Sequence, residues 1–208
     1  MILDVLTDFK QIAQIAHENA KNKGFWDDEF KHGKPRNNGE ILSLIHAEIY
    51  ELHEALLNPS QVSKKIAYSK NTQVIYEFEE ELADILIRLA DMVLSRHWTI
   101  WDYFAIESPF YHKTVQSLQD FEALSISSEQ YDFVRANVIC NFFHSCLGQV
   151  TEALREQHPP IHLICLAFSS MVRMMAYLET TYYFNINRAI GLKLEYNKHR
   201  PHMHNKQF

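Results

Sequence analysis

Two short acidic motifs contain the residues of this sequence that are best suited to chemistry. They are an ExxE motif with Glu48 and Glu51, and an ExxD motif with Glu81 and Asp84. Carboxylates three residues apart share one face of a helix, so two such helices packed side by side would gather four carboxylates at one point. Like charges this close are costly to keep ionised without a cation. The motifs therefore predict a metal site, and all-oxygen ligation suits Mg²⁺ or Mn²⁺.

The helices that must carry these motifs are predicted from apolar spacing. Apolar residues recur at helical intervals over residues 38–57 and 72–96, and Glu48 and Glu81 fall at the margins of the two apolar stripes. Ordinary surface charge is less common at such margins. A solvated acidic face is the alternative interpretation of either motif alone. A ferritin-like di-iron site matches less well, because the Glu-x-x-His pair that it requires occurs here only in a predicted loop.

The rest of the chain is also predicted to be helical, since five glycines and six prolines in 208 residues leave long uninterrupted runs. The other expected helices cover residues 3–23, 114–123, 127–157 and 161–181. Gly24 is expected to end the first helix, and Asn38 to cap the first acidic one. A long polar loop with aromatic residues lies between them, and such loops are often functional. The fold class is therefore all-α.

Composition excludes several function classes. The formal net charge of −6 gives no basic footprint, so nucleic acid is not an expected partner. We find no basic, apolar leader and no window approaching the roughly 18 apolar residues of a membrane span, so no membrane partner is expected and the predicted location is cytoplasmic. The three cysteines, Cys140, Cys146 and Cys165, are expected to be buried small hydrophobes.

Taken together, these motifs resemble the MazG-like nucleotide pyrophosphohydrolases of the all-α NTP pyrophosphatase superfamily, relatives of the dimeric dUTPases. The resemblance includes Lys-Gly-Phe-Trp-Asp at residues 23–27, which is similar to the family's nucleotide-side loop. It also includes residues 193–201, which are similar to the family's K-x-x-Y-N-x-x-R-P tail. In all it covers residues 1 to about 97 and about 183 to 208.

The resemblance implies Mg²⁺-dependent hydrolysis of nucleoside triphosphates, either dNTPs or modified nucleotides, to a monophosphate and pyrophosphate in a house-cleaning role. The residues that would hold the metal and carry catalysis are Glu48, Glu51, Glu81 and Asp84. The residues that would bind the substrate are Phe25 or Trp26, by stacking on the base, and Lys193, Asn197, Lys198 and Arg200, through phosphate. The alternatives are a catalytically lapsed module that binds nucleotide or a protein partner, and a helical scaffold. For Trp26 the alternative is a core anchor, and for the tail a basic, disordered end.

The second half of the chain resembles a degraded copy of the first. Residues 141–154 align with residues 43–56, so that His144 matches His46. In this register, Cys146 and Gln149 stand where the first half has its ExxE acids. A weaker alignment of residues 170–173 with 85–88 replaces the ExxD acids by Leu166 and Ser169, or by Cys165 and Phe168 after a one-residue slip.

We therefore predict a tandem of an intact and a degenerate repeat, forming a MazG-like pseudo-dimer with one live metal site. Its parts would be residues 1–107, a linker at 108–128, and residues 129–208, whose tail would close the active site. The two halves would form either separate units or one compact domain, and a homodimer is also allowed. The alternative is an unrelated helical insertion between about residues 98 and 182.

Overall fold

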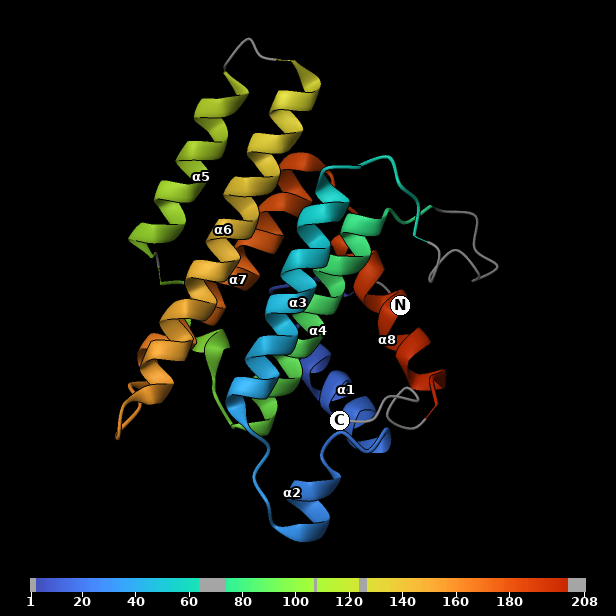
Figure 1. Ribbon diagram of the computed structural model, residues 1–208, viewed down its shortest axis with the longest axis vertical. Helices are drawn as coiled ribbons and strands as arrows, with labels where there is room; N and C mark the ends of the chain where they lie inside the picture. Colours follow the sequence, from blue (N-terminus) through green and yellow to red (C-terminus); the bar gives the residue numbers. More distant parts are fainter. Residues whose placement is uncertain (1–2, 64–73, 107, 124–126, 202–208) are drawn as a thin grey trace.

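The computed structural model describes residues 3–63, 74–106, 108–123 and 127–201, and within these ranges the protein is all-helical, as predicted (Figure 1). An isolated β-bridge joins Val62 and Tyr76. The α-helices are α1 (Phe9–Asn22), α2 (Asp27–His32), α3 (Asn38–Leu56), α4 (Glu77–Ser95), α5 (Pro109–Glu122), α6 (Ser128–Arg155), α7 (Ile161–Tyr182) and α8 (Ile186–His199). A 3₁₀ helix, η1, spans Ile100–Tyr103.

Local side-chain to backbone hydrogen bonds set several helix ends that apolar spacing misplaces. The Asp4 carboxylate accepts from the backbone N–H groups of Leu6 and Thr7, so α1 begins at Phe9 and not at residue 3. The cap of α3 is Asn37, one residue before the predicted one, and its side chain accepts from the Gly39 N–H at 2.7 Å. Gly24 ends the first helical segment with φ of 83°, as predicted.

Two further predictions about helices need correction. The segment expected to be a loop after Gly24 contains α2, whose first turn is acidic and whose last turn is basic, in line with the helix dipole. The second acidic helix begins at Glu77, because the Glu79 side chain accepts from the Tyr76 N–H and Tyr76 pairs with Val62. Its predicted start at residue 72 lies outside the described residues.

The helices pack around two antiparallel pairs, α3 with α4 and α6 with α7 (Figure 1). Helix α3 also packs against α6, and these two helices run in opposite directions. On the far side of α4, α1 and α8 pack against it and against each other. Helix α5 covers α6, and η1 covers α7. The first part of the predicted tail, residues 193–199, thus belongs to α8, which lies against the helix carrying the ExxD motif.

Helices α3 and α6 correspond in burial as well as in sequence. When residues 41–56 are aligned with residues 139–154, buried, half-buried and exposed positions coincide except where Leu44 matches Phe142 and where Leu56 matches Leu154. The matched histidines touch each other: His46 Nδ1 lies 2.8 Å from His144 Nδ1, and the two rings are stacked. Burial lowers the pKa of both imidazoles.

Among the described residues, α7 is a helix long and apolar enough to cross a membrane by length and composition. The expectation that no segment approaches this threshold was therefore wrong. In the fold, however, 61% of that apolar stretch is buried inside the protein, where α7 packs against α6 and η1. The core helix of a soluble protein passes the same test, so the finding is weak evidence for a membrane span.

Candidate metal and nucleotide site

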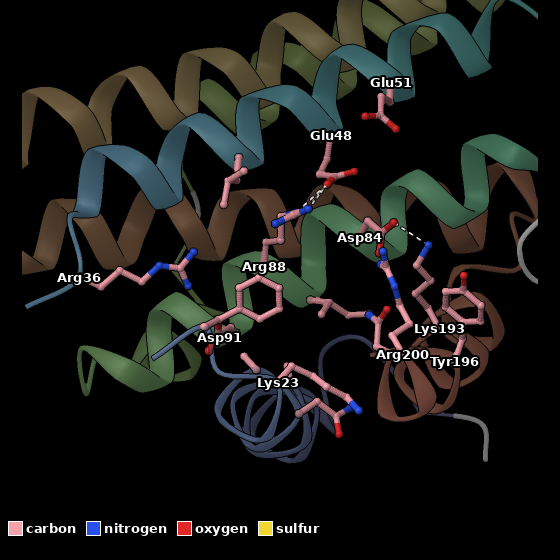
Figure 2. A pocket seen from close by; sticks show the side chains of 17 residues that line it. Lys23, Arg36, Glu48, Glu51, Asp84, Arg88, Asp91, Lys193, Tyr196 and Arg200 are labelled. Atoms are coloured by element: carbon pink, nitrogen blue, oxygen red, sulfur yellow. Dashed lines mark hydrogen bonds and ion pairs between the residues drawn. The ribbon is translucent and has the colours of Figure 1, made fainter. Parts of the chain in front are cut away.

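A cavity of about 330 Å³ lies between α1, α3, α4 and α8 (Figure 2). This volume falls within the roughly 300–1,000 Å³ typical of small-molecule sites. The basic residues that line it are Lys23, Arg36, Arg88, Lys193 and Arg200. The acidic residues that line it are Glu48, Glu51, Asp84 and Asp91. Both motifs and the predicted tail therefore contribute to one cavity, which also brings in residues that the motifs did not include.

Three of the four predicted metal ligands form one cluster beside this cavity. Carboxylate oxygens of Glu48, Glu51 and Glu81 lie within 4.8 Å of one another. Two oxygens bound to one Mg²⁺ are at most about 4.2 Å apart, twice the metal–oxygen distance. Glu51 is exposed and free to adjust, whereas Glu48 and Glu81 are buried. The donor set therefore fits a small hard cation that keeps some of its waters.

The fourth predicted ligand, Asp84, has a protein cation as its partner. Its carboxylate lies 2.7 Å from the ammonium nitrogen of Lys193, which is 1% exposed and also binds Glu80. Burial raises the pKa of Asp84, the Lys193 charge counteracts this, and the nearby Glu48 charge raises it further. Burial would lower the pKa of Lys193, but Asp84 and Glu80 outweigh it and raise that pKa. Lys193 therefore stays protonated, and it ties α8 to α4.

Arg88 plays a similar part for the first motif. Its Nε and one terminal nitrogen lie 2.6 and 2.5 Å from Glu48 Oε1, which joins α4 to α3 beside the cavity (Figure 2). Arg88 is one helical turn beyond Asp84, on the acidic flank of α4. Its place on this flank follows from helical spacing, but its partner does not. Its contact leaves the second oxygen of Glu48 outside this ion pair.

The two aromatic candidates occupy different positions. Phe25 lines the cavity. Trp26 is 1% exposed, does not line the cavity, and donates its indole N–H to Asp91 at 3.0 Å. The guanidinium of Arg36 lies over both rings, 5.8 Å from the Phe25 centroid and 5.1 Å from the Trp26 centroid. Trp26 thus has the position of a core anchor, and Phe25 is the aromatic candidate that lines the cavity.

The tail residues also separate into two groups. Lys193, Asn197 and Arg200 line the cavity, and among the described residues no hydrogen-bond partner reaches the buried Asn197 Oδ1. Lys198 does not line the cavity: its side chain is 62% exposed and lies 3.8 Å from Glu195. Residues 202–208, the end of the predicted tail, lie outside the described residues.

Asp91 is a cavity residue that the motif search missed. It is 8% exposed, and it accepts from Trp26 and from His17, whose Nδ1 lies 2.7 Å from Asp91 Oδ1. Because an ionised carboxylate only accepts, the His17 nitrogen is the donor. The available signal was spacing, since Asp91 follows Asp84 by two helical turns and therefore lies on the same face of α4.

Comparison with protein-family models, with curated proteins and with solved structures gave no significant match for this chain.

Proposed function

We propose that the protein is a Mg²⁺-dependent nucleoside triphosphate pyrophosphohydrolase that converts dNTPs or modified nucleotides to a monophosphate and pyrophosphate. One observation carries the proposal: a cluster of three carboxylates adjoins a cavity lined by five basic side chains. Phosphoryl chemistry depends mainly on positioning and on neutralising charge. An acidic cluster for a metal beside basic groups for phosphate provides both.

The acidic cluster is the proposed metal site, with Glu48, Glu51 and Glu81 as ligands and Asp84 beside them. Bound there, Mg²⁺ would neutralise phosphate charge and activate a water molecule. The carboxylates themselves would hold the ion at the boundary between α3 and α4. Asp84, which is not one of these ligands, would accept a hydrogen bond from the attacking water and orient it.

The basic residues are the proposed phosphate contacts. Arg200 directly follows α8, Lys23 directly follows α1, and Lys193 is fixed on the acidic side by Asp84. Because these cations come from different parts of the chain, they contact a polyphosphate from several sides and fix its orientation in the cavity. The base then lies toward Phe25, where the ring supplies a stacking surface.

We also propose that the chain is a tandem of an intact and a degenerate repeat that together form a pseudo-dimer. The matching burial of residues 41–56 and 139–154 supports this, because the register was chosen from residue identity alone. The contact between His46 and His144 supports it independently. Equivalent residues touch each other where a twofold axis passes between two copies.

The experiment is pyrophosphate release from a panel of dNTPs and NTPs, with Mg²⁺ or with EDTA, for the wild type and for Glu51→Gln. We expect metal-dependent turnover that the substitution reduces by about 10²–10³-fold. Absence of turnover with every nucleotide would refute the enzymatic proposal.

A second candidate is a lapsed module that binds nucleotide without hydrolysis. It is favoured by the ion pairs of Glu48 with Arg88 and of Asp84 with Lys193, which already neutralise part of the acidic charge. Metal-dependent nucleotide binding without pyrophosphate release would identify this function. Absence of both binding and release would leave the helical scaffold.

A further inference from the structure

We infer that Asp91 selects nucleotides whose base carries an exocyclic amino group, namely adenine, cytosine or guanine, over uracil and thymine. The inference rests on the proposed function of the cavity and assigns a substrate class to it. Its basis is a buried carboxylate that lines the cavity at the end away from the metal cluster, beside the surface proposed for base stacking.

The position of Asp91 suits the base rather than the phosphates. Asp84 and Asp91 are seven residues apart on α4, which corresponds to about 10 Å along the helix axis. In Figure 2, Asp91 and Arg36 lie toward one end of the cavity, and Glu51, Lys193 and Arg200 lie toward the other. Phe25, which also lines the cavity, has Arg36 over its ring. A nucleotide with its phosphates at the metal end therefore has its base near Asp91.

The hydrogen bonds of Asp91 leave one oxygen with capacity for a ligand. Oδ1 accepts from His17 at 2.7 Å and from Trp26 at 3.0 Å, whereas Oδ2 accepts from the same Trp26 N–H at 3.2 Å. An ionised carboxylate oxygen has two lone pairs and no proton to donate. Oδ2 therefore has room to accept a hydrogen bond from the cavity. The two donors on Oδ1 also fix the orientation of the carboxylate.

The chemistry of the bases then determines the preference. Adenine, cytosine and guanine present amino groups on their edges, and a carboxylate accepts from such groups. Uracil and thymine offer the carboxylate one ring N–H, and this N–H is flanked on both sides by carbonyl oxygens, so a carboxylate that accepts from it also lies next to an acceptor. A buried acceptor that meets another acceptor loses its hydrogen bond without compensation. The amino-bearing base is therefore bound more tightly.

The first test compares wild-type kcat/KM for substrates that differ only in the exocyclic amino or carbonyl group and the proton on the neighbouring ring nitrogen: dCTP with dUTP, and dATP with dITP. The amino member of at least one pair is expected to be preferred by about 10–100-fold, the value of one hydrogen bond to a charged group. This measurement needs no variant. Equal kcat/KM values within both pairs, or a preference for dUTP and dITP, would overturn the inference.

The second test repeats these ratios with Asp91→Asn, whose amide presents a donor as well as an acceptor. The preference is expected to fall at least tenfold or to reverse, while a purely structural Asp91 would change all substrates equally and leave the ratio intact. Glu18→Gln, an exposed change of the same kind on α1, is the control and should preserve the ratio.

Binding of dCMP and dUMP, and of dAMP and dIMP, separates this inference from the proposed hydrolysis. Preferential binding of an amino-bearing nucleotide without turnover of any triphosphate would refute hydrolysis and support the role of Asp91. Turnover without preference would support hydrolysis and refute that role. Absence of both binding and turnover would refute both.

Discussion

The α3–α4 and α6–α7 pairs have the same antiparallel arrangement, but they bury different chemistry. Among the described residues, the buried charged side chains lie on α3, α4 and α8. At the matched positions the second pair has groups such as Cys146, which is 1% exposed and whose pKa burial raises to about 12. That thiol is protonated at neutral pH and is no ligand for a hard cation.

This difference shows that the packing itself does not require the acids. Burying a carboxylate is unfavourable unless it is paired or hydrogen-bonded. The acids of the first pair have partners: Arg88 on α4 for Glu48, and Lys193 on the adjoining α8 for Glu80 and Asp84. The matching arginine of α7, Arg173, instead donates to the Ile106 carbonyl oxygen at 2.7 Å. Comparison with the α6–α7 pair therefore separates the contribution of helix packing from that of the acidic residues.

The largest expected effect is on stability, and it comes from removing Lys193, the cation that neutralises acids of the α3–α4 pair. Lys193→Met should lower the free energy of unfolding by about 3–5 kcal/mol, because the buried Glu80 and the half-buried Asp84 would lose their ammonium partner. Chemical denaturation at pH 7 measures the change. Lys198→Met, at an exposed position on the same helix, is the control and should stay within about 0.5 kcal/mol of the wild type. A loss for Lys193→Met as small as that of the control would show that this ion pair does not stabilise the acidic side.

Matched substitutions in the two motifs should differ almost as strongly in activity. Glu51→Gln is expected to reduce kcat for pyrophosphate release by about 10²–10³-fold, the effect of losing one group that stabilises transition-state charge. Gln149→Glu introduces the converse change at the corresponding exposed position of α6 and should leave kcat unchanged. Steady-state assays at saturating Mg²⁺ make the comparison. Equal effects of the two substitutions would contradict a single live site.

A buried acid introduced into α6 tests whether the α6–α7 pair lacks a cation to partner it. Cys146→Glu is expected to lower the free energy of unfolding by about 2–3 kcal/mol, because the new side chain enters a buried site whose matching arginine is bound elsewhere. Ser145→Glu, at the exposed neighbouring position, should change stability by less than about 0.5 kcal/mol. A Cys146→Glu variant as stable as the wild type would mean that α6 and α7 can accommodate the charge.

The sequence alone predicted the features that follow from helical periodicity, and it did not predict the contacts that form when one helix packs on another. Apolar spacing found α3, α4, α6 and α7, and i to i+3 spacing indicated the carboxylates of Glu48, Glu51 and Glu81 that now lie together. The ion pair of Lys193 with Asp84 was not predictable, because it forms only when α8 packs on α4. The predicted helix ends were wrong where a single side chain accepts backbone hydrogen bonds near the start of the helix, as Asp4 does before α1.

The smallest expected effect tests the contact between the two halves. In a double-mutant cycle at pH 8, His46→Ala and His144→Ala should show a coupling of about 0.5–1.5 kcal/mol in the free energy of unfolding, because their rings stack and their Nδ1 atoms share a hydrogen bond. At this pH both rings are neutral, since burial lowers their pKa values from the ordinary value of about 6.5.

The control cycle combines His46→Ala with His199→Ala, an exposed residue of α8, and should be additive within about 0.5 kcal/mol. If the His46 and His144 substitutions were equally additive, the two rings would be neighbours without interaction, and the pseudo-dimer would lose the contact that supports its axis. A measured coupling would make the contact between matched residues a stabilising interaction, as in an interface between two copies of one unit. The loss of acids from α6 and α7 would then be a divergence between halves that still pack as equivalents.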